Sequence, residues 1–195
     1  MMNWMGILIQ KEIKKTDTVL DLGCGIFQAT TDSLTKTSGK GSFTYRLRTA
    51  NMQKNLECKS LLGCELVDKY IDVAKSYFPV IKMDISKLEN YKMFADKSFD
   101  VVMAIDVLEH IPIGISEKII EEMKRISRNK VIVYTPSKFE LNEENTTNAW
   151  NLGENPFQQH LSFVSPDILK EHGFKRITFP EPDKNTFAIW EKSEK

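Results

Sequence analysis

The chain has 195 residues, a length that suits one domain with a full hydrophobic core and is short for two. Hydrophobic residues make up 41% and charged residues 28%, as in ordinary soluble proteins, and no apolar run approaches the roughly 20 residues that span a bilayer. The formal net charge is 0 at pH 7, so no overall field would attract nucleic acid or an anionic membrane. We therefore expect a single domain over residues 1–195, without stable membrane insertion.

The opening stretch, MMNWMGILIQKEIKK, is apolar and then basic, which is the reverse of a signal peptide. We expect an amphipathic helix that lies on a sheet; docking of this helix at a membrane surface through Trp4 is the alternative. Three cysteines, Cys24, Cys58 and Cys64, are an odd number without the spacing of a metal site. Because nothing in this pattern indicates a disulfide framework, we predict a cytoplasmic protein.

Short β-type runs alternate with amphipathic stretches along the remaining chain. Ser165 before Pro166, with Gly173 further on, is typical of a helix with a defined start and stop. Repeated β-α units favour an α/β fold with a mostly parallel sheet and helices on both faces. The last two strands must be antiparallel because their connection is short. The expected strands span 18–22, 60–65, 80–84, 99–106, 130–136, 174–180 and 186–192, and the expected helices lie at 66–78, near 115–128 and at 165–173.

Two long stretches interrupt this rhythm, and loops of such length in a compact domain are usually functional or disordered. Residues 31–60 hold six basic and two acidic residues. We interpret them as an insertion that forms a lid, with a clamp for an RNA strand as the alternative. Residues 137–160 are polar and rich in asparagine, and we expect a substrate-side loop there. In or beside this loop, Trp150, Phe157 and Phe163 could line an apolar acceptor pocket, or Trp150 could anchor the loop to the core.

The motif VLDLGCG at residues 19–25 joins an apolar run to a turn with two glycines. In open α/β sheets, ligands bind beyond the carboxyl ends of the strands, and such a turn brings backbone N–H groups to an anion. A dinucleotide site would have a third glycine where Gln28 stands, and no Gly-Lys-Ser/Thr of a phosphate-binding loop follows. The turn alone leaves a pyrophosphate and a carboxylate open as ligands.

Acidic residues follow the next strands. Glu65 ends the second expected strand, Asp84 ends the third, and AIDVLEHIP follows the fourth. A carboxylate at Glu65 can accept hydrogen bonds from both hydroxyls of a ribose, and one at Asp84 can accept an adenine amino proton. Solvated acids at strand ends are the alternative for both residues.

The chain resembles the class I S-adenosylmethionine-dependent methyltransferases from Thr18 to about Trp190. The segments that carry the resemblance are VLDLGCG, LLGCELVDKYIDVAK, VIKMDI, SFDVVMAIDVLEHIP, VIVYTP and HLSFVSPDILKEHGF. The resemblance implies a Rossmann-like fold whose seven-stranded, mostly parallel sheet has an antiparallel last strand. It also implies S-adenosyl-L-methionine as the cofactor and S-adenosyl-L-homocysteine as the product.

The resemblance also implies which residues hold the cofactor. By this correspondence Asp21, Gly23, Cys24 and Gly25 frame its methionine end, Glu65 and Leu66 take the ribose, Asp84 and Ile85 bracket the adenine, and Asp106 faces the methionine part or the substrate. Asp21 could instead be a buried acid that orders the turn, and the two roles are compatible. Phe27 stands where the family often has a glycine.

Candidate catalytic residues follow the fourth expected strand. Methyl transfer from a sulfonium is an in-line displacement, so the protein mainly positions the nucleophile, excludes water and supplies a base to a hydroxyl. Glu109, His110 and the distant His160 are the candidates. Asp106, Glu109 and His110 would gather on one side of a helix, at i, i+3 and i+4. We expect His110 to act as a base or hydrogen-bond partner.

The same residues could hold a divalent metal ion, because two carboxylates and two imidazoles are suitable ligands. A similar arrangement occurs in the metal-dependent methyltransferases that act on the 3′-terminal ribose of small RNAs, and a related one in the ubiquinone-type O-methyltransferases. Asp106 stands where a glutamate is usual, which shortens its reach. We favour a metal-free site.

These observations predict an enzyme that moves the methyl group of S-adenosylmethionine to an oxygen or nitrogen of a small-molecule acceptor. One alternative is a metal-assisted 2′-O-methyltransferase that acts on RNA 3′ ends. The other is a cofactor-binding partner protein without catalysis of its own. The sequence predicts neither the identity of the acceptor nor the oligomeric state.

Overall fold

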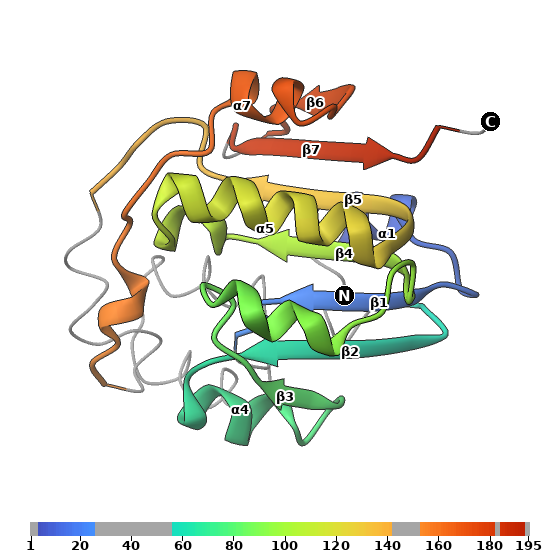
Figure 1. Ribbon diagram of the computed structural model, residues 1–195, viewed down its shortest axis with the longest axis vertical. Coiled ribbons are helices and arrows are strands. Elements are labelled where there is room, and N and C mark those ends of the chain that lie inside the picture. The colour runs from blue at the N-terminus through green and yellow to red at the C-terminus, as the bar shows by residue number, and fades with distance from the viewer. Residues whose placement is uncertain (1–3, 26–55, 142–152, 182–183, 194–195) are drawn as a thin grey trace.

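The computed structural model of the protein describes residues 4–25, 56–141, 153–181 and 184–193. Seven strands form one sheet in the order β3-β2-β1-β4-β5-β7-β6 (Figure 1). The strands are β1 (Thr18–Leu22), β2 (Ser60–Glu65), β3 (Val80–Lys82), β4 (Phe99–Ile105), β5 (Ser127–Thr135), β6 (Arg176–Thr178) and β7 (Thr186–Glu191). The described helices are α1 (Trp4–Glu12), α4 (Asp68–Ala74), α5 (Ile113–Ile126) and α7 (Pro166–Glu171), with 3₁₀ turns η1 (Leu88–Met93), η2 (Leu108–His110) and η4 (Pro156–Gln158).

The direction of the strands confirms the expected fold class. The pairs from β3 to β5 are parallel, whereas β7 is antiparallel to both β5 and β6. The strand order reverses next to β1, where the chain winds outward to β2 and β3 and then returns to β4. In such sheets the crevice beyond the carboxyl ends of the strands at this reversal is where ligands bind. Here it lies beyond β1 and β4.

Helices cover both faces of the sheet, as expected (Figure 1). On one face, Ile9 of α1 and the nearby Ile13 pack with Val101 and Met103 of β4. On the other face, α5 packs with Val102 and Ala104 of the same strand. Successive residues of β4 therefore point to opposite layers, and both layers are apolar, which explains why its sequence is a continuous hydrophobic run.

Several boundaries differ from the expected ones for local reasons. The helix after β2 begins at Asp68 rather than residue 66, because the Glu65 carboxylate binds the N–H groups of Leu66 and Val67 and turns the chain first. The strand expected at 130–136 begins at Ser127, directly after α5, and pairs with Phe99 before a bulge. The strands expected at 80–84, 99–106, 174–180 and 186–192 are shorter than predicted.

The helix stop and start signals near the C-terminus act as predicted. Ser165 caps α7, since its Oγ accepts a hydrogen bond from the N–H of Ile168 at 3.2 Å, and Pro166 is the first helical residue. Gly173 follows the helix with φ +83°, in the left-handed region that favours glycine. The chain is thereby directed into β6.

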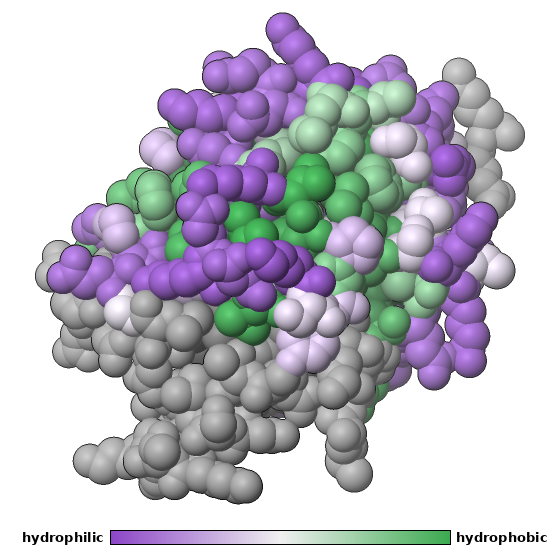
Figure 2. Space-filling model, turned by 90° about the horizontal axis from the view of Figure 1, so that it is seen from below, coloured by the Kyte–Doolittle hydropathy of each residue, from purple (hydrophilic) through white to green (hydrophobic). Residues whose placement is uncertain are grey.

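One edge of the sheet is formed by the short strand β3. Seen from that side, apolar side chains appear as a band between polar ones (Figure 2). Because β3 has three residues, this edge offers few backbone groups to a further strand. None of the helices in the described ranges is long and apolar enough to cross a membrane.

The two long interruptions are only partly described. Residues 31–55 of the expected insertion, together with Phe27 and Gln28, lie outside the described residues. So do residues 142–152 of the expected substrate-side loop, including Trp150. Of the described parts of that loop, residues 153–160 run beside the carboxyl ends of the strands (Figure 1).

Candidate active site

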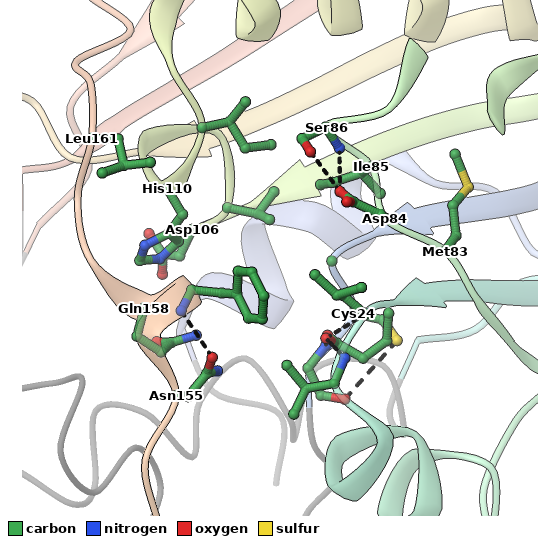
Figure 3. Close-up of a pocket in the computed structure, with 18 of the residues that line it drawn as sticks. Cys24, Met83, Asp84, Ile85, Ser86, Asp106, His110, Asn155, Gln158 and Leu161 are labelled. Atoms are coloured by element: carbon green, nitrogen blue, oxygen red, sulfur yellow. Dashed lines mark hydrogen bonds between the residues drawn. The ribbon is translucent and has the colours of Figure 1, made fainter. Parts of the chain in front are cut away.

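A cavity of about 300 Å³ lies at the carboxyl edge of the sheet (Figure 3). Its walls come from the glycine turn after β1, the ends of β2 and β4, the chain after β3, and residues 155–161. Nine of the residues with expected cofactor or catalytic roles line it directly: Gly23, Cys24, Gly25, Glu65, Leu66, Asp84, Ile85, Asp106 and His110.

The glycine turn is fixed against β2. The N–H groups of Gly23 and Cys24 both donate to the carbonyl of Cys64, at 2.9 and 3.0 Å. Gly23 has φ +69°, and a side chain there would collide with Cγ2 of Val107. The Cys24 side chain is buried against Gly63, and burial raises the pKa of its thiol well above the ordinary value. Cys24 thus contributes its backbone to the cavity wall while its thiol stays protonated at neutral pH.

Glu65 joins the glycine turn to the start of the next helical segment. Its carboxylate is buried and accepts hydrogen bonds from the N–H groups of Gly25, Leu66 and Val67, at 2.9, 2.8 and 3.0 Å. Burial raises the pKa of Glu65, although these three bonds oppose the shift. Because an ionised carboxylate can accept about four hydrogen bonds, this one retains capacity for a donor from a ligand in the cavity.

Asp84 and Ile85 follow β3 rather than ending it. The Asp84 carboxylate accepts from both the N–H and the hydroxyl of Ser86, at 2.9 and 2.6 Å, so its side chain is held in one orientation at the cavity wall (Figure 3). Ile85 beside it is buried. An oriented carboxylate next to an apolar side chain is a suitable surface for a planar base with an amino group.

Asp21 and Asp106 differ in position. Asp21 lies in β1, before the turn, where it is 1% exposed and does not line the cavity. Asp106 lines the cavity and has φ +49°, a left-handed conformation that is uncommon outside glycine and recurs at functional sites. Its N–H donates to the carbonyl of Tyr134 at 2.8 Å.

The candidate catalytic residues Glu109, His110 and His160 come together in space. One ligand atom from each lies within 4.8 Å of the others, and the two imidazole rings are 4.9 Å apart. Asp106 is not one of these three residues. The helix expected from Asp106 onward is instead a three-residue 3₁₀ turn that starts at Leu108, so positions i, i+3 and i+4 do not lie on one helix.

The environment of this group changes the pKa of every member. Glu109 is 3% exposed and accepts a hydrogen bond from the Thr135 hydroxyl at 3.2 Å, and burial raises its pKa to about 7. Burial lowers the pKa of His110 and of His160, and their proximity lowers that of His160 further. Both imidazoles are therefore neutral at pH 7.

Backbone carbonyls determine which nitrogen of each imidazole carries the proton. Nδ1 of His110 faces the carbonyl of Gln159 at 3.1 Å, and Nδ1 of His160 faces that of Glu140 at 2.6 Å. A carbonyl can only accept, so each Nδ1 is the donor and each Nε2 is the acceptor nitrogen.

Sequence reasoning did not identify the residues that hold segment 155–161 in place. Asn155 is 2% exposed and donates to the hydroxyl of Tyr70 on α4, at 3.0 Å. Its Oδ1 accepts from the N–H of Phe157, which caps η4 before Pro156. The Asn-Pro pair is a recognisable start signal for a helical turn, but the contact with Tyr70 has no local signal.

Comparisons with known proteins agree with this geometry. The sequence profile described as a methyltransferase domain matches residues 34–135, just over half of the chain. No match was found among curated protein sequences.

Solved structures share the fold at low identity. An S-adenosylmethionine-dependent methyltransferase from Archaeoglobus fulgidus has 18% identity and a TM-score of 0.59, over 96% of this chain and 94% of that one. A protein from Pyrococcus horikoshii has 16% identity and a TM-score of 0.61, with 97% and 88% covered. The magnesium protoporphyrin IX methyltransferase from Synechocystis, solved with bound SAH, has 14% identity and a TM-score of 0.55, with 96% and 78% covered.

The profile match identifies the family, and the structural likeness independently shows the fold that the sequence predicted. The chain belongs to the methyltransferase-domain family and is a class I S-adenosylmethionine-dependent methyltransferase.

Proposed function

We propose that this enzyme transfers the methyl group of S-adenosylmethionine to an oxygen or nitrogen of a small-molecule acceptor in the cavity at the carboxyl edge. The observation that carries the proposal is the position of His110. Its neutral imidazole lines the same cavity as Gly25, Glu65 and Asp84. A candidate base therefore lines the same cavity as the residues suited to the cofactor.

The chain's residues fit the cofactor. The glycine turn would hold its methionine end, the remaining acceptor capacity of Glu65 would take a ribose hydroxyl, and Asp84 with Ile85 would bracket the adenine. Asp106 would face the methionine part or the acceptor. When bound, S-adenosylmethionine supplies an electrophilic methyl group on a sulfonium.

His110 would accept the proton that the nucleophile loses. Its Nδ1–H bond to the Gln159 carbonyl keeps Nε2 as the acceptor and holds the ring in place. Glu109, behind it, has a pKa near neutrality and can exist in either protonation state at pH 7. Apolar side chains of Phe157 and Leu161 at the cavity wall would help to exclude water.

A metal-dependent reaction is a second candidate, because Glu109, His110 and His160 offer three ligand atoms within 4.8 Å. Two histidines that donate Nδ1–H to carbonyls and present Nε2 are the arrangement expected of metal ligands. These three side chains would hold such an ion, which would act as a Lewis acid on an acceptor oxygen.

Transfer of a labelled methyl group tests the proposal. The purified enzyme is incubated with labelled S-adenosylmethionine and fractionated cell extract, with and without a chelator. We expect label in the small-molecule fraction that persists with chelator. Loss of labelling with chelator would favour the metal-dependent reaction, and label in RNA would favour the ribose methyltransferase. Binding of the cofactor without labelling of any fraction would favour the non-catalytic partner protein.

A further inference from the structure

A strap of residues 153–162 crosses the carboxyl edge of the sheet. Four of its residues, Asn155, Phe157, Gln158 and Leu161, line the cavity. Figure 3 shows Asn155 and Gln158 on the opposite side of the cavity from Cys24 and Asp84. The strap therefore faces the residues proposed to hold the cofactor.

One end of the strap is fixed to α4, the helix that follows Glu65. Lys69 Nζ donates to the carbonyl of Glu154 at 2.8 Å, and Asn155 Nδ2 donates to the hydroxyl of Tyr70 at 3.0 Å. Asn155 and Tyr70 are only 2% and 1% exposed. The same amide accepts from the N–H of Phe157, so Asn155 connects α4 to the turn that carries Phe157 and Gln158.

The other end of the strap is fixed beside the catalytic candidates. The N–H groups of Leu161 and Ser162 both donate to the carbonyl of Glu109, at 2.8 and 3.0 Å. The carbonyl of Gln159 accepts from Nδ1 of His110 at 3.1 Å. The strap thus spans the cavity from the proposed ribose side to the proposed chemical centre, with an anchor at each end.

We propose that Asn155 is a positioning residue, which acts through Tyr70 to hold the strap against the bound cofactor and beside His110. The proposal rests on the proposed function, because the ligand that the strap would cover is S-adenosylmethionine. Removing the Asn155–Tyr70 bond from either side takes away the buried anchor at the α4 end of the strap and leaves the exposed Lys69–Glu154 contact, so the strap covers the cofactor less tightly. It also loosens the Gln159 carbonyl that orients His110.

A double-mutant cycle tests this role directly. S-adenosylhomocysteine binding is measured by calorimetry, well below the unfolding temperature, for wild type, Asn155→Ala, Tyr70→Phe and the double variant. We expect each single change to weaken binding about tenfold, and the double change to weaken it no further than either single change. Asn129→Ala, at the opposite edge of the sheet, is the matched control and should bind as wild type does.

A second readout separates positioning from general stability. The imidazole signals of the three histidines are followed by NMR in the same variants. We expect Asn155→Ala and Tyr70→Phe to change the tautomer balance of His110 and to leave His172, which contacts Glu121 instead, unchanged.

The proposal is overturned if the variants unfold at lower temperature yet bind S-adenosylhomocysteine as wild type does, or if the two effects on binding simply add. If Asn155→Ala does not fold, Tyr70→Phe and Lys69→Ala carry the test, since each removes one anchor only. If wild type itself binds no S-adenosylhomocysteine, the proposed function fails, and the His110 signals then decide whether the strap still controls that residue.

Discussion

Carboxylates at the amino ends of the strands (the amino edge) and at their carboxyl ends (the carboxyl edge) have opposite pKa shifts. At the amino edge, Glu12 accepts hydrogen bonds from Lys130 at 2.9 Å and from Arg176 at 2.7 Å. Asp100 accepts from Thr18 and Arg128. Burial raises the pKa of both acids, but these hydrogen bonds and the nearby positive charges outweigh it, and both pKa values lie below the ordinary range.

At the carboxyl edge, the hydrogen bonds to the buried Glu65 and Glu109 come from neutral groups. Glu65 accepts hydrogen bonds from backbone N–H groups, and Glu109 accepts one from a threonine hydroxyl. Burial raises the pKa of each. Buried acids that keep a raised pKa are unfavourable to the fold, and they are typical of functional sites. From this comparison we expect substitutions at the amino edge to change stability, and substitutions at the carboxyl edge to change the proposed chemistry.

The largest effect should come from the carboxyl edge. We expect His110→Ala to lower the rate of methyl transfer by roughly 10²- to 10⁴-fold, because a general base contributes about that much. Affinity for S-adenosylhomocysteine should stay near the wild-type value. Labelled-methyl assays and calorimetry measure the two quantities, and His172→Ala is the control. Equal losses of rate and cofactor affinity would mean that His110 belongs to the cofactor site.

Substitutions at the amino edge should change the stability of the protein rather than its affinity for the cofactor. We expect Glu12→Ala to lower the free energy of unfolding by about 1–3 kcal/mol, since Lys130 and Arg176 lose a largely buried partner. Urea denaturation measures this change. Glu181→Ala, from an exposed pair with Lys184, should change it by less than about 0.5 kcal/mol. Weaker cofactor binding in Glu12→Ala would contradict the division between the two edges.

Glu65→Gln tests the cofactor assignment with little change in volume. The new NH₂ group would face the N–H of Gly25 or the N–H groups of Leu66 and Val67, so one side of the turn loses its acceptor. We expect S-adenosylhomocysteine to bind about tenfold more weakly, which is about 1.4 kcal/mol. Glu121→Gln on the surface is the control. Unchanged affinity in Glu65→Gln would remove Glu65 from the site.

The smallest expected effect is on the pH dependence of stability, which should differ between the amino and the carboxyl edge. Glu109 has an ordinary value of 4.5 and a folded pKa of about 7, so the folded chain binds more protons between these values. Its contribution to stability therefore falls as pH rises from about 4.5 to 7. Glu12 behaves oppositely: its contribution is present above pH 4.5 and is lost as pH falls through its lowered pKa.

Thermal unfolding at several pH values checks these signs. We expect Glu109→Gln to flatten the decline between pH 4.5 and 7, and Glu12→Gln to alter the curve mainly below pH 4.5. If Glu109→Gln left the curve unchanged, the raised pKa of Glu109 would be wrong.

Local sequence signals predicted the frame of this molecule well. The expected strands 18–22 and 60–65 match β1 and β2 to the residue, because each is an apolar run that ends at a turn-forming or acidic position. The order of motifs led to the correct family. These features depend on neighbours in the chain, so they can be read from sequence alone.

The details of the site depend on contacts between distant residues. Asn155 and Tyr70 are far apart in the chain, and no local pattern pairs them. Glu109 lies between Leu108 and His110, a context that gives no sign of its complete burial, and the left-handed Asp106 breaks the expected helical spacing. The pKa values that distinguish the two edges follow from this tertiary packing.

The most direct test is a calorimetric titration of the purified wild-type chain with S-adenosylhomocysteine, with NADH as the control ligand. We expect one S-adenosylhomocysteine to bind per chain and NADH not to bind, with the same result for Glu12→Gln at neutral pH. Binding of NADH alone, or of neither ligand, would contradict the assignment of the carboxyl-edge cavity to S-adenosylmethionine.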